Sequence, residues 1–321
     1  MEVYLIYYHY YQYFFIFNFQ FIYNIRNTLQ QSFIYSFIFI YQNIFFIILI
    51  QFFIKFILYI NYQFYQIFSS FFPQLIKYQY LNSSNKIGLI GAPNIGSGLG
   101  KCINLSNLIL ILNCNNIGDE GSSGLGSGLG KCTNLSNLTL NLQNNNIGAI
   151  GALGLGSGLG KCTNLSNLIL NLDHNNIGDE GVSGLFSGLR QCINLSNIEL
   201  YFCNNNIGEI GALGIGSGLG KYTNLSNLTL NLYNNNIGGI GASGLGYNIG
   251  KCTNLSELKL NVLKNNIGEI GSSGIGSGLV NCINLQNLTL FFYCKEININ
   301  QQFKVKCLKS KRLVVLNINY W

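Results

Sequence analysis

The chain contains little charge, little histidine and almost no proline. Lys, Arg, Asp and Glu together make up 9% of its 321 residues, against about 25% in ordinary soluble domains. Two His leave little material for His-based metal sites or for acid–base catalysis. Pro occurs only twice and no Gly-X-Y triplet runs through the chain, which excludes a collagen-like protein. Hydrophobic residues make up 48% of the chain, which argues against wholesale disorder.

Several motifs that carry chemistry are also missing. There is no C-x-x-C cluster for zinc, and the kinase signatures H-R-D, D-F-G and V-A-I-K are absent. The string Gly126–Lys131 approaches a phosphate-binding loop, but Leu125 replaces its first Gly and Cys132 its Ser or Thr. His174 lies beside Asp173, but no nucleophile is indicated there. We therefore expect no enzymatic activity, catalytic residue, metal, cofactor or small-molecule substrate.

Glycine is missing from the first 87 residues, and all 38 Gly fall between Gly88 and Gly278. Residues 1–70 instead hold 12 Tyr and 15 Phe. We place a boundary near residues 69–75, and residues 1–70 form a separate aromatic and apolar segment. Residues 33–50 contain no charge, which meets the length of a membrane-spanning helix. The sequence thus makes residues 33–60 a candidate transmembrane helix.

Three interpretations of residues 1–70 stay open. They form one or two membrane helices, or they are translated non-coding sequence from a mistaken gene prediction, or they are a buried or aggregation-prone segment. If the anchor is real, Lys77 and Lys86 favour repeats that face the cytoplasm. Repeated Asn-Leu-Ser sequons agree, because glycans on successive units would crowd one another. Without the anchor we expect a cytoplasmic protein.

A thirty-residue repeat organises the rest of the chain. Six regular units span residues 101–280. One column of the repeat is always asparagine, at Asn115, Asn145, Asn175, Asn205, Asn235 and Asn265. A cysteine column holds six of the ten Cys, which we expect to be buried free thiols. Reduced thiols suit a cytosolic setting.

Each unit predicts a strand, a turn and a helix. Leucines alternate at 108, 110 and 112, which is strand periodicity. Gly118 and Gly121 indicate a turn, and Leu125 and Leu129 share one helical face. The predicted helical part, Gly124–Lys131, has four Gly, each costing about 0.5–1 kcal/mol relative to Ala. We therefore expect short helices that are frayed or partly 3₁₀, with close approach between units as the benefit. Stacking must bury what no single unit can bury alone.

The motif Leu110-x-Leu112-x-x-Asn115-x-Ile117 resembles the leucine-rich repeat family. The unit length and the Gly-x-x-Gly turn resemble its ribonuclease-inhibitor type. The resemblance implies an α/β solenoid with a curved parallel sheet on the concave side and helices on the convex side. It also implies that the asparagine column forms a ladder of side-chain bonds to the backbone, since buried bend groups need partners.

Degenerate units flank the array. Residues 71–100 keep parts of the pattern and are expected to cap its N-terminus. Residues 281–321 form a degenerate C-terminal repeat and a basic cap, with one last strand predicted at Leu313-x-x-Leu316-x-Ile318. Residues 295–321 carry +5 of the net charge of +7 (six basic minus one acidic). Charge confined to one end does not supply a nucleic-acid groove, so we expect no nucleic-acid partner. A membrane or acidic-partner patch is the alternative to the cap.

Positions that vary between otherwise similar units indicate a binding surface. These positions lie at the outward-facing residues of each strand and in the turn after it. Aromatic and charged groups dominate binding hot spots. The residues predicted to contact a protein partner on the concave face are Asp173, His174, Glu199, Tyr201, Tyr233, Lys259 and Lys264. The predicted function is a non-enzymatic scaffold for protein–protein interaction. Two alternatives are a non-catalytic part of a kinase-associated repeat protein, and a gene-prediction product without a dedicated role.

Overall fold

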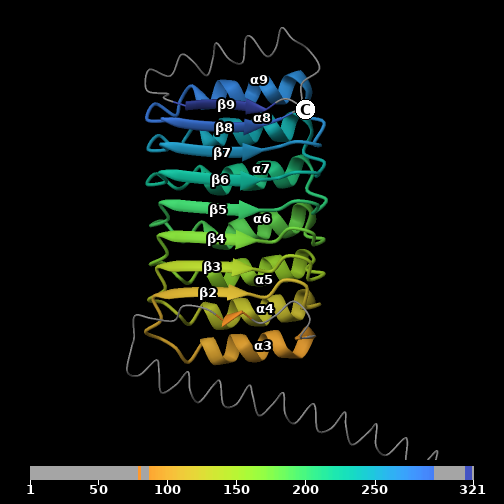
Figure 1. Ribbon diagram of the computed structural model, residues 1–321, viewed down its shortest axis with the longest axis vertical. Helices are drawn as coiled ribbons and strands as arrows, with labels where there is room; N and C mark the ends of the chain where they lie inside the picture. Colours follow the sequence, from red (N-terminus) through yellow and green to blue (C-terminus); the bar gives the residue numbers. More distant parts are fainter. Residues whose placement is uncertain (1–78, 81–86, 293–314, 320–321) are drawn as a thin grey trace, which may run out of the picture. The chain divides into compact units, whose positions relative to one another are not determined.

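A single parallel sheet backed by helices forms the described part of the chain (Figure 1). The computed structural model describes residues 87–292 and the backbone of residues 79–80 and 315–319. Strands and helices alternate along the sequence, and the strands pair in sequence order from β1 to β9. The strands lie in one layer and the helices in a second layer behind it. All of these elements belong to one compact unit, Phe68–Trp321.

The nine strands of the described part are short, and seven helices separate them. The strands are β1 Gln79–Tyr80, β2 Asn107–Ile111, β3 Asn137–Asn141, β4 Asn167–Asn171, β5 Asn197–Tyr201, β6 Asn227–Asn231, β7 Glu257–Asn261, β8 Asn287–Phe291 and β9 Val315–Asn319. The helices are α3 Gly88–Leu99, α4 Gly118–Leu129, α5 Ala149–Leu159, α6 Gly178–Leu189, α7 Glu209–Leu219, α8 Gly238–Ile249 and α9 Gly268–Leu279.

Pairing from β2 to β8 follows the thirty-residue register predicted from the sequence. Leu108 pairs with Leu138, and Leu138 pairs with Leu168. Within each of these strands the second and fourth residues are buried toward the helices, because side chains alternate between the two faces of a strand. The predicted alternation of leucines is therefore confirmed. The strand expected near Leu316 and Ile318 is also present, as β9.

The helices differ from the expectation. Helix α4 begins at Gly118, so the predicted turn at Gly118–Gly121 is wrong, and the helical part is not limited to Gly124–Lys131. The helices are α-helices of 11 or 12 residues rather than short, frayed or 3₁₀ segments. Tertiary packing outweighs the low propensity of Gly, since Leu125 and Leu129 are fully buried against the sheet.

Glycines lie where neighbouring helices touch. A Cβ atom on Gly158 in α5 would collide with the backbone of Gly126 in α4, and Gly188 meets Gly156 in the same way. The expected close approach of successive units therefore occurs at these positions. At Gly218 the neighbouring group is instead the Phe186 ring of α6, which fills the space that a Cβ would need.

Two aspartates hold the start of the helix in the following unit. Oδ1 of Asp119 accepts hydrogen bonds from the backbone N–H groups of Gly148 and Gly151, at 2.7 and 2.8 Å. Asp179 bonds Gly208 and Gly211 in the same way. A carboxylate near a helix start is favoured by the helix dipole, and these two aspartates also cap the helix of the next unit.

The asparagine column satisfies the bend after each strand. Oδ1 of Asn145 accepts the backbone N–H groups of Asn115 and Ile117 in the preceding unit, at 2.9 and 3.3 Å. Its Nδ2 donates to the carbonyl groups of Leu112 and Gln143, at 2.8 and 3.1 Å. Equivalent bonds recur along the column, for example at Asn235. One amide therefore pairs four backbone groups and joins two units.

Some predictions fall outside the described residues. These are the candidate transmembrane helix at 33–60, the rest of residues 1–70, and the basic residues of 295–312. Among the residues that the structure does describe, no helix combines the length and the apolar character needed to cross a bilayer.

The substitution Gly158→Ala tests the helix contact. Ala favours a helix by about 0.5–1 kcal/mol relative to Gly, but the clash with α4 costs about 1–3 kcal/mol. We expect a lower free energy of unfolding in urea. The exposed neighbour Ser157→Ala is the matched control and leaves stability unchanged or slightly raised. A stabilised Gly158→Ala variant would contradict the close contact.

The substitution Asn145→Ala tests the ladder. It leaves buried N–H and carbonyl groups of two units without their partners, at about 1–3 kcal/mol for each group that water does not reach. We expect the free energy of unfolding to fall by about 3–4 kcal/mol. Gln143→Ala, whose side chain lies outside the ladder, should change it by less than about 0.5 kcal/mol. Equal effects of the two substitutions would show that the ladder contributes little.

Candidate functional site

The open face of the sheet, opposite the helices, is built mainly from asparagine and threonine. The first strand residue of β2 to β6 is always Asn, and each Nδ2 from β3 onward donates to Oδ1 of the Asn in the preceding strand. Each Nδ2 also donates to the Ser hydroxyl just before it. The sequence analysis missed this second ladder, although its unbroken column of Asn at thirty-residue spacing was a visible signal. A repeated background of this kind makes any departure from it conspicuous.

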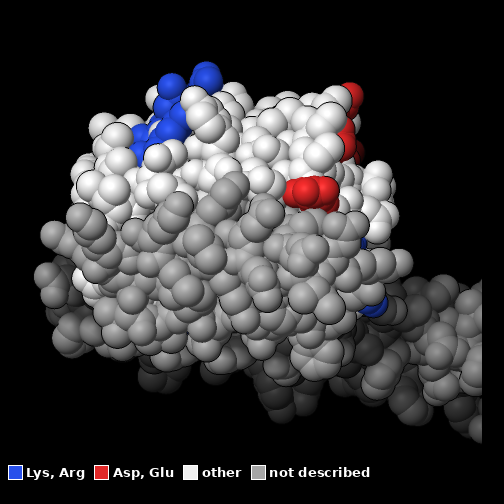
Figure 2. Space-filling model, turned by 90° about the horizontal axis from the view of Figure 1, so that it is seen from above, with Lys and Arg blue, Asp and Glu red and all other residues white. Residues whose placement is uncertain are grey.

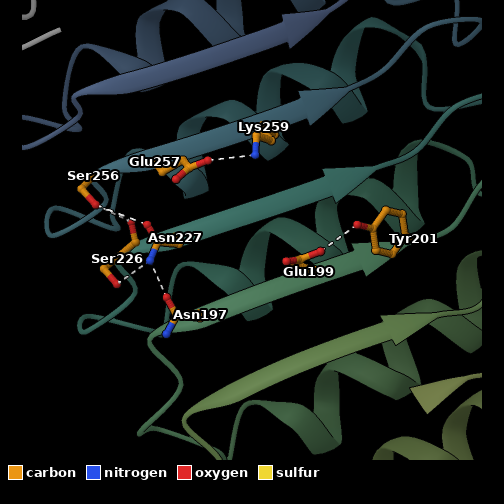
Figure 3. Close-up of polar contacts among 8 residues, drawn as sticks. All are labelled: Asn197, Glu199, Tyr201, Ser226, Asn227, Ser256, Glu257 and Lys259. Atoms are coloured by element: carbon orange, nitrogen blue, oxygen red, sulfur yellow. Dashed lines mark hydrogen bonds and ion pairs between the residues drawn. The ribbon is translucent and has the colours of Figure 1, made fainter. Parts of the chain in front are cut away.

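Glu199 and Tyr201 form the first departure, on β5 (Figure 3). The hydroxyl of Tyr201 donates to Oε2 of Glu199 at 2.7 Å. Partial burial, followed by the hydrogen bond and the charge of Glu199, raises the pKa of Tyr201 to about 12. Because both side chains point out of the same strand, two residues apart, they lie on the open face as predicted from the sequence.

Glu257 and Lys259 form the second departure, on β7. Their side chains make an ion pair of 2.9 Å and remain 38% and 53% exposed (Figure 3). Glu257 replaces the Asn of the second ladder, and the Ser256 hydroxyl instead approaches Oδ1 of Asn227 at 3.5 Å. Lys259 is a predicted contact residue, whereas Glu257 was missed. Exposed ion pairs of this kind contribute little to stability.

Tyr233 and Lys264 meet at the edge of the open face where the strands end. Nζ of Lys264 lies 5.1 Å from the centre of the Tyr233 ring, within range of a cation–π interaction. Lys264 has a φ of 56°, in the left-handed region that favours Asn or Gly. At the same column three other units have Asn, at Asn144, Asn204 and Asn234. Cys114 and His174 adopt the same conformation at this column, so Lys264 is one of three residues there that accept backbone strain which Asn tolerates better.

Asp173 and His174 lie at the same edge, in the bend that follows β4. Oδ1 of Asp173 accepts the backbone N–H of Cys203 at 2.6 Å. His174 is exposed, and its Nε2 lies 3.5 Å from Nδ2 of Asn204. The predicted contact residues therefore fall into two groups. One group lies on the strands (Glu199, Tyr201 and Lys259), and the other lies in the bends after them (Asp173, His174, Tyr233 and Lys264).

The structure brings a cysteine beside Asp173, which the sequence analysis did not anticipate. Burial is the main cause that raises the pKa of Cys203 to about 12, and the charge and hydrogen bond of Asp173 add to it. The thiol is therefore protonated near neutral pH. Asp173 and Cys203 occupy the same column of the repeat, thirty residues apart, and this spacing was the signal for their contact.

The cysteine column is buried, as expected from the sequence. Its members are Cys102, Cys132, Cys162, Cys192, Cys252 and Cys282, and the last five are thiols outside any disulfide. Burial raises the pKa of Cys132 and Cys162 to about 12. Among the described residues, no group of three or more His, Cys, Asp and Glu side chains could hold a metal ion. The side chains that the open face does present are aromatic, charged and amide groups, which are suited to binding.

Comparison with known proteins adds little to this geometry. No protein-family model matches the chain, and no curated protein matches it. Among solved structures, an internalin from Listeria monocytogenes is 18% identical, with 70% of this chain and 72% of that chain covered and a TM-score of 0.28. A TM-score this low does not establish a shared fold. The strand order, the register and the asparagine ladder themselves define an α/β solenoid of repeated strand–helix units.

The reactivity of two thiols tests the environment of Cys203. We expect iodoacetamide at pH 8 to modify the exposed Cys114 rapidly and Cys203 at least roughly tenfold more slowly, because little of the Cys203 thiol is ionised. Peptide mass spectrometry measures both rates in one sample. Asp173→Asn should accelerate the reaction of Cys203, since it removes one cause of the raised pKa. Equal rates in the native protein would contradict the assigned environment, and unfolding in urea should abolish the difference.

Proposed function

We propose that the chain is a non-enzymatic scaffold that binds a protein partner on the open face of its sheet. The proposed contact surface spans β5 to β7 and the bends that follow β4 to β7. The observation that carries the proposal is the concentration of charged and aromatic side chains there, on a face otherwise built from repeated Asn, Thr and Ile. Tyr, together with charged groups at its rim, is typical of interaction hot spots.

Exposure and orientation support this surface. Glu199, Tyr201 and Tyr233 are partly exposed, and Lys259 and Lys264 are exposed. Each is held by a neighbour of the same face, through a hydrogen bond, an ion pair or a cation–π contact. Such pre-ordering lowers the entropy lost when a partner binds.

Local strain gives further support. Lys264 and His174 adopt a left-handed backbone conformation at a column where three units have Asn and one has Cys. Breaking a local rule without a structural gain is characteristic of functional positions. Asp173 also has a structural role, through its bond to Cys203.

The proposal includes the ribonuclease-inhibitor type of repeat and the concave location of the open face. The return of each described unit through an α-helix of 11 or 12 residues supports that type. Membrane tethering through residues 33–60 and a cytoplasmic location stay sequence predictions. No observation on the described residues favours the kinase-associated alternative, so it forms no part of the proposal.

A matched pair of triple variants tests the proposal. The full chain and the variant Glu199→Ala/Tyr201→Ala/Lys259→Ala are each used to capture proteins from the cells that express the chain, with quantification by mass spectrometry. We expect at least one specifically captured protein to fall about tenfold or more with the variant, equivalent to about 1.4 kcal/mol of binding free energy.

The control variant carries three substitutions of exposed side chains on the helix side, Leu153→Ala/Leu213→Ala/Tyr247→Ala. None of these side chains lies on the open face, and their exposed fractions are 52%, 38% and 62%. We expect the control to retain the captured protein. Retention of every specific partner by the open-face variant would exclude this surface as the binding site.

A further inference from the structure

Exposed isoleucines line two rims of the array, at the two ends of its helices. The helix-start rim consists of the first helical turns and their exposed neighbours, and its isoleucines are Ile90, Ile150, Ile210, Ile240 and Ile270, which are 59–80% exposed. The helix-end rim consists of the segments that lead from each helix to the next strand, and it exposes Ile103, Ile193 and Ile283 by 60–64%. Rows of large exposed apolar side chains are typical of interaction surfaces.

The two rims carry opposite charge. The helix-start rim has the exposed acidic residues Glu120, Glu180, Glu209 and Glu269. The helix-end rim has the exposed basic residues Lys131, Lys161, Arg190, Lys221 and Lys251. Figure 2 shows the large basic cluster and the acidic clusters on opposite sides of the described surface. The helix dipole favours these signs at these ends, but it does not account for the exposed isoleucines beside them.

The rims also share one spacing. Each lies on columns that recur every thirty positions, so both rims advance by one coil of the same solenoid. The exposed acidic residues occupy the coils of α4, α6, α7 and α9. An acidic rim and a basic rim with the same repeat can face each other over several coils in register. A second copy of the chain carries both rims, so the contact needs no other partner.

We propose that copies of this chain associate side by side, with the helix-start rim of one copy against the helix-end rim of the next. Several exposed ion pairs would set the register, and the isoleucines would be buried between them. The two contacting surfaces differ, so the contact is heterologous and leaves one rim free on each copy. Assembly can therefore continue beyond a dimer.

This assembly leaves the open face of every copy accessible. It would place several open faces side by side, which raises the apparent affinity for a multivalent partner. None of the residues proposed to bind a partner on the open face belongs to either rim. The inference therefore does not depend on the proposed function.

A charge-swap experiment on the full chain tests the proposal. Variant A is Lys131→Glu/Lys161→Glu/Lys221→Glu, and variant B is Glu120→Lys/Glu180→Lys/Glu209→Lys. Sedimentation velocity over a concentration series measures association at ionic strengths of about 0.1 M and about 1 M, where the Debye length falls from about 10 Å to about 3 Å. We expect the unmodified chain to associate at the lower salt and to dissociate at the higher.

Each variant alone brings like charges together at its substituted positions, so its apparent dissociation constant should rise at least roughly tenfold. An equimolar mixture of A and B should associate again, because every contact then joins opposite charges. Circular dichroism confirms folding, and the milder Lys131→Gln/Lys161→Gln/Lys221→Gln variant should weaken association without misfolding. Swapping Glu257→Lys/Lys259→Glu on the open face should leave association unchanged.

Three results would overturn the proposal. One is a monomeric chain at both salt concentrations. Another is association of A or B alone as strong as that of the unmodified chain, which would place the contact elsewhere in the sequence. The third is a mixture of folded A and B that stays monomeric.

Discussion

The array must combine two spacings that ordinarily differ, the distance between neighbouring strands and the distance between neighbouring helices. Strands in a parallel sheet repeat about every 4.8 Å, whereas packed helices lie about 8–10 Å apart. Each unit adds one strand and one helix, so the helices must approach closely or the stack must bend. Glycines at the helix contacts, such as Gly126 and Gly158, remove the Cβ atoms that would keep the helices apart. The high Gly content is therefore a packing requirement, and its cost in helix propensity is offset by burial of the leucines between the two layers.

Polar groups are satisfied by the same neighbour-to-neighbour logic. Asn145 serves the backbone of the preceding unit, Asp119 caps the helix of the following one, and Cys132 donates from its thiol to the carbonyl of Leu99 at 3.3 Å. None of these bonds can form within an isolated unit. An isolated unit would therefore leave buried donors and acceptors unpaired, which makes the array cooperative between neighbouring units.

The strand register and the asparagine ladder were accessible from the sequence because both follow directly from a thirty-residue column. The helix boundaries were not, since the propensity of Gly gave the wrong answer where tertiary packing decides. The cap from Asp119 was missed because its partner lies 29 residues away and belongs to another unit. Glu199 and Tyr201 were identified as outward residues from strand alternation. The contact of Asp173 with Cys203 was missed, although the two residues occupy the same column of neighbouring units.

The units around β5 depart from the repeat on both of their faces. Behind the strand, Phe186 and Phe202 bring their rings to 6.4 Å, where the other regular units of residues 101–280 have Gly and Leu or Val. Tyr222 replaces a cysteine of the column, and its hydroxyl is the one buried side-chain polar atom of the described part without a hydrogen-bond partner. Such a group costs about 1–3 kcal/mol. Stability alone does not favour these exceptions in an array whose other units solve the same packing problem with Gly, Leu and Cys. They lie in the units of β5 and β6, beside the strand that carries Glu199 and Tyr201, and a local cost in stability beside departures on the exposed face is the pattern expected of a functional site.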